Sequence, residues 1–382
     1  MRKLRFALQA VCLLASLLVA SVAMAEPGPY SVTPPTKLTA PVFKRGDEAM
    51  PVILDADMVD LFDDGVAMLM LADSPRIDLL GVTVCIGNSW VEDGVASAIR
   101  QLEGFGRTDI PVYAGVNQVT RKDRYENIEK ERKMFGWGKE TYMGSVSYPE
   151  PKSWLDAYRK RFKAEPTAQP QEEHAVDYII RTVKARPHEV TIVAIGTGAN
   201  MAAALKKAPE IAPLIKRMIY MGGAFYHEGN STPVAEFNYW IDPEAAKIMI
   251  RADYPEQIFL PLDVCERVAM NAARYHDLES RIKNPIFKNL WDNHYMKELF
   301  KKYPDHKNFV WDVLAAAVAI DPSLVEEEYF QYVDVNDVYS PCYGQTLAFQ
   351  GEPPEGTRKA HIVQTIDQAR LWAMITKVFD KM

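Results

Sequence analysis

The feature that most restricts the fold of this chain is a dense run of aspartates directly after an apolar segment. Five aspartates occur within ten positions after Val52-Ile53-Leu54, in the order Asp55-Ala56-Asp57-Met58-Val59-Asp60-Leu61-Phe62-Asp63-Asp64-Gly65. The apolar residues predict a buried strand, and ligands of an open parallel sheet collect outside the carboxyl ends of its strands. The run therefore indicates a ligand site where this strand ends. Capping of the next helix together with a solvated acidic turn is the alternative interpretation.

Mutual repulsion argues for a cation among these carboxylates. Two carboxylates about 4 Å apart repel each other by roughly 4 kcal/mol at an effective dielectric constant near 20. A bound cation relieves this repulsion, and the run contains no histidine or cysteine. Ligands that are all oxygen atoms suit the hard ions Ca²⁺ and Mg²⁺, and several carboxylates favour Ca²⁺.

The rest of the chain alternates short β-type runs with helical patterns. This alternation predicts an α/β fold with an open, mainly parallel, Rossmann-like sheet and helices on both faces. The predicted strands are Pro51–Leu54, Leu79–Ile86, Pro111–Tyr113, Val190–Ile195, Met218–Met221 and Ile258–Leu262. Helices are predicted near Asp63–Ala72, Val91–Leu102, His174–Ala185, Asn200–Lys206, Pro243–Arg251, Trp311–Ile320 and Asp367–Phe379. Two polar segments rich in aromatics, Gln118–Gln171 and roughly Ala272–Phe309, are typical of insertions that cover an active site.

The amino-terminal residues are typical of an exported protein. Three basic residues precede an apolar run from about Ala10 to Val22 that ends in Ala23-Met24-Ala25. This pattern predicts a cleaved secretory signal peptide over residues 1–25 and a periplasmic location, with a short N-terminal anchor as the alternative. Residues 26–48 are rich in proline and threonine, and we expect an extended leader there, followed by a single catalytic domain over residues 49–382.

Charge and cysteine content exclude several classes of function. The 382 residues include 44 basic and 51 acidic ones, a net charge of −7, and removal of the signal peptide leaves 41 against 51, or −10. Binding to nucleic acid or to an anionic membrane needs an excess of lysine and arginine. Cys85, Cys265 and Cys342 are odd in number and lack metal-ligand spacing, so neither a disulfide framework nor a cysteine nucleophile is predicted.

The aspartate run resembles the amino-terminal signature of the nucleoside hydrolases, enzymes that hydrolyse the N-glycosidic bond of ribonucleosides. Further landmarks follow in the order of that family over about residues 50–380: Gly87-Asn88, Ile110-Pro111-Val112-Tyr113-Ala114-Gly115, Ala194-Ile195-Gly196-Thr197-Gly198-Ala199-Asn200, Met221-Gly222-Gly223, Gly229-Asn230, Ala235-Glu236-Phe237-Asn238, Asp242-Pro243-Glu244-Ala245-Ala246, Pro261-Leu262-Asp263-Val264 and Trp311-Asp312. The resemblance implies the nucleoside hydrolase fold, a calcium-dependent N-ribosyl hydrolase acting on small ribonucleosides, and assembly into a homodimer or homotetramer.

The resemblance also implies roles for single residues. The implied calcium ligands are Asp57, Asp64, Asp312 and the backbone carbonyl of Ile195, with Asp55 as a supporting carboxylate whose metal contact stays open. Asp57 looks like the general base for the metal-bound water. The implied ribose-binding side chains are Asp63, Asn88, Asn230, Glu236 and Asn238. The family usually has three residues between its second and third aspartates, whereas five stand between Asp57 and Asp63, so we expect this loop to bulge.

The residue before the distal aspartate favours purine nucleosides. Broad-specificity members of the family carry a histidine there that can protonate the leaving base, whereas Trp311 resembles the purine-preferring group. An indole stacked on a nucleobase contributes roughly 1–3 kcal/mol of binding. We expect Phe135 or Trp137 of the first insertion to form the second wall of the stack, with Tyr142 behind them. Two histidines remain as alternatives to solvent as the proton donor: His294 and His227.

Two rival interpretations stay open. A phosphotransferase of the haloacid-dehalogenase type also places an Asp-x-Asp after a buried strand, but that reading does not explain Asp63-Asp64 or Trp311-Asp312. A secreted nucleoside- or ribose-binding protein could have the same pocket with little turnover, and the altered spacing of the aspartates is its only support.

Overall fold

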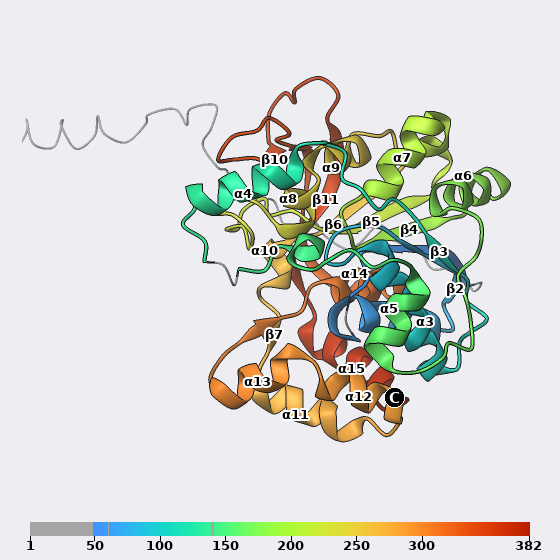
Figure 1. The fold of residues 1–382 in the computed structure, drawn as a ribbon. Helices are drawn as coiled ribbons and strands as arrows, with labels where there is room; N and C mark the ends of the chain where they lie inside the picture. The colour runs from blue at the N-terminus through green and yellow to red at the C-terminus, as the bar shows by residue number, and fades with distance from the viewer. Residues whose placement is uncertain (1–48, 60, 139–140) are drawn as a thin grey trace, which may run out of the picture. The chain divides into compact units, whose positions relative to one another are not determined.

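The computed structural model describes residues 49–59, 61–138 and 141–382 (Figure 1). The predicted signal peptide (1–25) and leader (26–48) lie outside the described residues. The described residues form a mostly parallel sheet with helices, so the predicted α/β fold class is confirmed. No helix in these ranges combines the length and the apolar character needed to cross a lipid bilayer.

A nine-stranded sheet runs through the described part of the chain in the order β10-β9-β11-β6-β5-β4-β1-β2-β3. Its strands are β1 (Met50–Ala56), β2 (Ile77–Val84), β3 (Val112–Ala114), β4 (Thr191–Ala194), β5 (Arg217–Met221), β6 (Gln257–Leu260), β9 (Val325–Val335), β10 (Thr346–Phe349) and β11 (Arg358–Ile366). Neighbours from β3 through to β11 pair in parallel, and β9 pairs antiparallel with β11 and β10. The strand order reverses at β1, which lies between β2 and β4, and a parallel sheet forms a ligand crevice at such a point.

The first six strands match the predicted ones, but the sequence analysis does not predict β9, β10 and β11. For β9 the reason is its exposure. β9 contains Glu326, Glu327 and Glu328, and more than half of its side chains are only partly buried or exposed. A strand near the open end of a sheet does not need the apolar run by which buried strands are recognised.

Seven helices match the predicted ones closely: α2 (Val66–Asp73), α3 (Val91–Phe105), α6 (Ala175–Ala185), α7 (Ala199–Lys207), α9 (Pro243–Ile250), α14 (Asp312–Ile320) and α15 (Gln368–Phe379). Two short helices are added by the structure, α8 (Phe237–Ile241) and α10 (Leu262–Cys265). The first insertion contains α4 (Arg124–Met134) and α5 (Trp154–Phe162), and the second contains α11 (Ala272–Arg281), α12 (Pro285–Asp292) and α13 (Tyr295–Lys302). A small ribbon of β7 (Ala269–Met270) and β8 (Asn308–Phe309) closes the second insertion. Within the described chain, Cys85, Cys265 and Cys342 form no disulfide.

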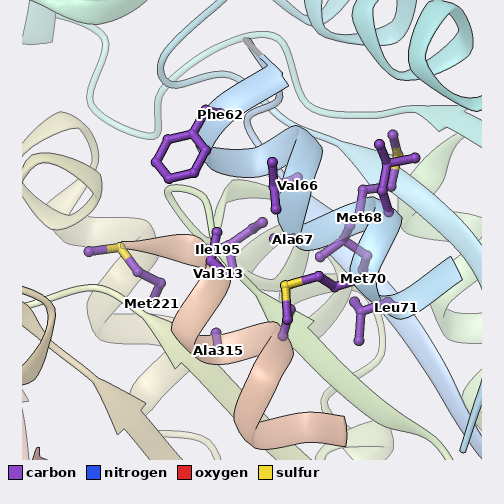
Figure 2. Close-up of a cluster of buried hydrophobic side chains, with 14 of the residues drawn as sticks. Phe62, Val66, Ala67, Met68, Met70, Leu71, Ile195, Met221, Val313 and Ala315 are labelled. Atoms are coloured by element: carbon purple, nitrogen blue, oxygen red, sulfur yellow. The ribbon is translucent and has the colours of Figure 1, made fainter. Parts of the chain in front are cut away.

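Helices α2 and α14 form the apolar support of the site (Figure 2). Both are apolar on all sides, and a helix with that pattern must be buried. α14 contains Ala315, Ala316 and Ala317, whose small side chains permit close approach to α2. A five-residue π-helical turn, η1 (Leu61–Gly65), leads into α2 and holds Phe62 in an extended conformation (φ −114°, ψ 105°). This irregular turn accommodates the long spacing between Asp57 and Asp63 and brings the beginnings of α2 and α14 together.

Candidate active site

A cavity of about 1410 Å³ opens where the central parallel strands end. Its wall includes Asp63 and Asp64 after β1, Asn88 after β2 and Met221 at the end of β5. The first insertion contributes Tyr142 and the second contributes Tyr295, so both insertions line this cavity. Ligand pockets commonly measure about 300–1,000 Å³, so this cavity is large enough for a nucleoside-sized molecule.

Asp57 lies beneath the wall of the cavity, at the end of β1. Its side chain is fully buried, and it is not among the residues that line the cavity. Its Oδ2 atom accepts a hydrogen bond from the backbone amide of Asn88 (2.6 Å), whereas its Oδ1 atom is buried without a hydrogen-bond partner. Gly87 permits this contact, because a Cβ atom at that position would lie 2.0 Å from Oδ2 of Asp57. The chain is therefore built to hold one oxygen of Asp57 and to leave the other available.

Asp55 has a supporting role in the structure. Its Oδ1 atom accepts hydrogen bonds from the Thr83 hydroxyl (2.6 Å) and from the Asn200 amide (2.7 Å). Asp55 is fully buried and does not line the cavity. These contacts join β1, β2 and the beginning of α7, so Asp55 ties together the strand ends that carry the site.

Asp63 fastens the first loop to the distal helix. Its two carboxylate oxygens accept hydrogen bonds from the backbone amides of Trp311 (3.2 Å) and Val313 (3.4 Å), at the amino end of α14. The exposed amides and the dipole of a helix N-terminus favour such a carboxylate. Asp63, Asp64 and Asp312 all line the cavity, so residues about 250 positions apart meet at its wall.

The carboxylates of this site are difficult to ionise together. Burial raises the pKa of Asp57 to about 7, and the nearby Glu236 carboxylate adds to that rise. Burial likewise raises the pKa of Asp63 and of Glu236 to about 7. For Asp312, burial and then four neighbouring carboxylates hold the pKa well above its usual range. Those neighbours, in order of effect, are Asp63, Asp64, Asp57 and Glu236.

The carboxylate oxygens of this site suit a hard cation, but they do not converge on one point. Buried carboxylate oxygens without a partner, such as Oδ1 of Asp57 and Oδ2 of Asp55, suit Ca²⁺ or Mg²⁺. Nevertheless, no three acidic, histidine or cysteine side chains of the described residues converge closely enough to hold one metal ion. The backbone carbonyl of Ile195 accepts a hydrogen bond from the Asn238 amide (3.0 Å). Binding of a cation by this set therefore requires side chains to move toward one another.

The five predicted ribose-binding residues all line the cavity: Asp63, Asn88, Asn230, Glu236 and Asn238. Glu236 caps α8, because its carboxylate accepts hydrogen bonds from the backbone amides of Gly223, Asn238 and Tyr239. The side-chain amide of Asn238 donates to the carbonyl of Ile195, while its Oδ1 atom has no partner. Helix α8 thus presents polar groups to the cavity.

The structure separates the predicted aromatic residues into two groups. Trp311 lines the cavity, whereas Phe135 and Trp137 do not. Trp137 packs edge-on against Trp240, with ring centroids 5.7 Å apart, because its segment folds back onto the body of the domain. Tyr142, predicted to stand behind them, lines the cavity instead and stacks on Phe237 at 5.7 Å. The wall also contains aromatic residues to which the sequence analysis assigns no stacking role: Phe62, Trp90, Tyr148, Phe237 and Tyr295.

Neither candidate histidine lines the cavity. His294 is buried, and its Nδ1 atom accepts a hydrogen bond from the Met296 amide at the start of α13. Its Nε2 atom lies 3.0 Å from the carbonyl of Phe62. His227 contacts the carbonyl of Glu228 at 2.9 Å and lies outside the cavity wall. These contacts give His294 a structural role and leave no described histidine at the wall.

Comparison with known proteins agrees with this geometry. The family model for inosine-uridine preferring nucleoside hydrolases matches residues 52–373. The pyrimidine-specific ribonucleoside hydrolase RihB of Escherichia coli (strain SMS-3-5) is 31% identical over 338 residues, which cover 86% of this chain and 96% of that protein. The plant nucleoside hydrolase PpNRh1 matches with a TM-score of 0.70 at 26% identity, over 87% of this chain and 99% of that one. The purine-preferring ribonucleoside hydrolase from Gardnerella vaginalis matches with a TM-score of 0.68 at 26% identity, over 86% and 99%.

The raised pKa of Asp57 predicts how pH affects stability when no cation is bound. An aspartate in the unfolded chain has a pKa of about 3.9, whereas burial raises that of Asp57 in the native state to about 7. Between these values the native state binds more protons, so the free energy of unfolding falls as pH rises. The neutral substitution Asp57→Asn removes this contribution. With a chelator present, the variant should therefore gain stability relative to wild type as the pH rises from about 4 to about 7, by on the order of 1.4 kcal/mol per pH unit.

Urea unfolding at several pH values measures this difference. Asp305→Asn, which neutralises an exposed aspartate, is the control and should show a constant difference from wild type. A constant difference for Asp57→Asn as well would contradict the electrostatic description of the site.

Proposed function

Because this chain belongs to the family of inosine-uridine preferring nucleoside hydrolases, it hydrolyses the N-glycosidic bond of ribonucleosides, and we propose that it does so with calcium and with a preference for purine nucleosides. The observation that carries the proposal is the cluster of buried carboxylates at the point where the strand order reverses. Burying so many carboxylates together is energetically costly unless protons or a cation compensate their charge.

The proposed calcium ligands come from four separate segments of the chain. Asp57 follows β1, Asp64 precedes α2, and Asp312 begins α14. The backbone carbonyl of Ile195, directly after β4, completes the set, and Asp55 supports it from below through Thr83 and Asn200. When bound, a divalent cation supplies Lewis acidity to water and to sugar hydroxyls and neutralises the surrounding carboxylates. The unpartnered Oδ1 atom of Asp57 supports this assignment.

Asp57 is the proposed general base. The Asn88 amide holds Oδ2, so Oδ1 is the atom that takes a proton from the attacking water. Without a cation, burial raises the pKa of Asp57 to about 7, and a bound cation would lower it and favour the carboxylate form that accepts a proton. The water oxygen bonds to C1′ of the ribose while the bond from C1′ to the base nitrogen breaks. The electron pair of that bond leaves with the base, which takes its proton from solvent, and the products are ribose and the free base.

Aromatic side chains on the cavity wall support the purine preference. Trp311 provides one stacking surface, and Tyr142 with Phe237 provides a second aromatic group from the first insertion and α8. A purine offers a larger face for stacking than a pyrimidine. The relatives include both a pyrimidine-specific and a purine-preferring enzyme, so the family alone does not decide this point.

We further propose that residues 1–25 direct export to the periplasm and that the mature protein is a homo-oligomer. The basic, apolar and small-residue pattern of the N-terminus supports export. The assembly into dimers or tetramers is implied by family resemblance.

Release of free base from a panel of nucleosides, with and without chelator, tests the calcium proposal. We expect chelation to lower the rate by more than about 100-fold, the loss typical when an electrostatic catalyst is removed, and added Ca²⁺ to restore it. A rate that the chelator does not change would contradict the metal assignment. Calorimetric binding of inosine without base release would support the nucleoside-binding alternative.

Gly87→Ala tests the position of Asp57. The added Cβ atom would lie 2.0 Å from Oδ2 of Asp57 and 2.7 Å from its Cγ, so the carboxylate must move. A displacement of about 1 Å can cost 100-fold in rate, and we expect kcat/KM to fall by roughly that factor. Gly351→Ala is the matched control, because nothing lies within 4 Å of its Cβ position. If folded Gly87→Ala and Asp57→Asn both turn over substrate at the wild-type rate, Asp57 is not the base.

Trp311→Ala tests the base preference. The wild-type protein should show a higher kcat/KM for inosine than for uridine. Loss of about 1–3 kcal/mol of stacking should lower kcat/KM for inosine by roughly 10- to 100-fold and for uridine by less. Trp372→Ala, outside the cavity wall, should leave both values unchanged. Equal or pyrimidine-biased values for the wild type would overturn the purine proposal.

A further inference from the structure

Helix α8 carries polar groups that line the cavity, but it is too short to be stable without contacts to the rest of the protein. It has only five residues (Phe237–Ile241), and isolated helices of this length are not stable in water. Its amino end is held by Glu236, and Asn238 contacts the carbonyls of Ile195 (3.0 Å) and Met221 (3.3 Å). These contacts restrain the amino end of α8, and the carbonyls at its carboxyl end need partners from elsewhere.

A buried arginine of the first insertion holds that end. Arg124, the first residue of α4, is fully buried. Its guanidinium donates hydrogen bonds to the backbone carbonyls of Trp240 (2.7 Å) and Ile241 (3.1 Å), the last two residues of α8. Carbonyls at the end of a helix lack partners within it, and a planar arginine can satisfy two at once.

Glu131, about two turns after Arg124 on α4, completes the contact. Its carboxylate accepts two hydrogen bonds from Arg124 (2.8 and 3.3 Å) and one from the indole N–H of Trp240 (2.6 Å). The guanidinium also lies 4.9 Å from the ring centre of Trp240. Arg124 thus binds the backbone carbonyl of Trp240, and Glu131 binds its side chain.

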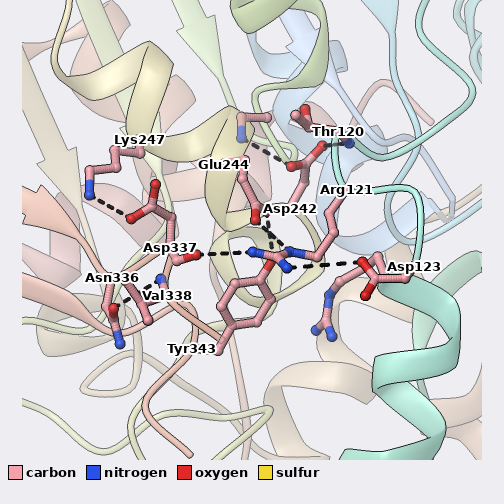
Figure 3. Close-up of polar contacts among 12 residues, drawn as sticks. Thr120, Arg121, Asp123, Asp242, Glu244, Lys247, Asn336, Asp337, Val338 and Tyr343 are labelled. Carbon is pink, nitrogen blue, oxygen red and sulfur yellow. Dashed lines mark hydrogen bonds and ion pairs between the residues drawn. The ribbon is translucent and has the colours of Figure 1, made fainter. Parts of the chain in front are cut away.

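A second set of contacts restrains the turn that follows α8 (Figure 3). The backbone amide of Thr120 donates to Asp242 (2.7 Å), which also caps α9. Arg121 donates to Glu244 (2.6 Å) and to the Tyr343 hydroxyl (3.0 Å). Both residues belong to the beginning of the first insertion, so this insertion fixes α8 from its far end as well as covering the cavity.

We infer that Arg124 and Glu131 are positioning residues, which orient Asn238 toward the sugar by holding the carboxyl end of α8. This inference rests on the proposed function, in which α8 faces the ribose. Arg124 and Glu131 do not line the cavity, so they act only through α8. The same insertion supplies Tyr142, which stacks on Phe237, so substrate coverage and sugar orientation are coupled through one segment.

Three substitutions in the full-length protein separate positioning from general stability. Glu131→Gln removes the charge that faces Arg124. Trp240→Phe removes the indole donor and keeps a smaller aromatic ring, so it carries the test if Glu131→Gln does not fold. Glu129→Gln makes the same chemical change on the same helix, at an ion pair with Arg132 (3.5 Å), and is the matched control.

Two measurements are compared, kcat/KM for inosine and the Kd for D-ribose by calorimetry with Ca²⁺ present. We expect Glu131→Gln to lower kcat/KM and to weaken ribose binding by about 10-fold, the value of a hydrogen bond to a charged group, and Trp240→Phe by about threefold. Glu129→Gln should match the wild type. In an Asn238→Ala background, Glu131→Gln should change kcat/KM by less than about twofold, because its effect passes through Asn238.

Three results overturn the inference: ribose binding in folded Glu131→Gln and Trp240→Phe equal to that of the control, a full effect of Glu131→Gln in the Asn238→Ala background, or no ribose binding by the wild type. Ribose binding that weakens in Glu131→Gln while the wild type releases no base from any nucleoside supports the positioning role and refutes the proposed function alone.

Discussion

The hydrogen bonds that Asp63 accepts from the backbone amides of Trp311 and Val313 join two segments about 250 positions apart, and the arrangement of the site depends on them. Packing of α2 against α14 brings these segments together, because each helix is apolar on all sides and has to be covered. The hydrogen bonds then set the register between the two helix beginnings. As a consequence, Asp64 and Asp312 stand at one cavity wall in a cluster that neither segment could form alone.

The same packing that builds the cluster also makes it costly. Apolar burial and mutual repulsion raise the pKa of these carboxylates, so folding without a cation favours their protonated forms. A protein optimised only for stability would replace such residues, whereas functional sites commonly retain groups that destabilise the fold. The amide of Asn88 and the side chains of Thr83 and Asn200 hold individual carboxylate oxygens and leave others without a partner. In an ordinary helix cap the carboxylate oxygens bind backbone amides, whereas here some oxygens accept hydrogen bonds and others are buried without a partner.

The parts of the fold that sequence alone predicts are those in which burial leaves a local signature. Strand β1 is an unbroken apolar run that ends in aspartates, and its neighbours in the parallel sheet are similar. β9 is partly exposed and carries three consecutive glutamates, so no such signature exists there. For the site, the five residues that the ordered motifs predict as ribose-binding all line the cavity, but the wall also contains polar residues that no motif predicts, among them Glu150, Lys152 and Arg161. The motifs did not predict that Trp137 packs on Trp240 while Tyr142 reaches the cavity, because the path of an insertion is decided by tertiary contacts such as the burial of Arg124.

Under the proposed function, this division between core and insertion separates the residues that bind the sugar from those that contact the base. The carboxylates and most of the proposed ribose-binding residues stand at strand ends and helix starts, where a change would disturb the sheet itself. Tyr142 stands on an insertion whose length and path can change without altering a single strand. Trp311 combines the two features, because its backbone amide donates to Asp63 while the residue also lines the cavity. A change of ring at that position can alter stacking without releasing the backbone contact that assembles the acidic cluster. Base preference can therefore vary at Trp311 and in the insertion independently of the hydrolytic chemistry.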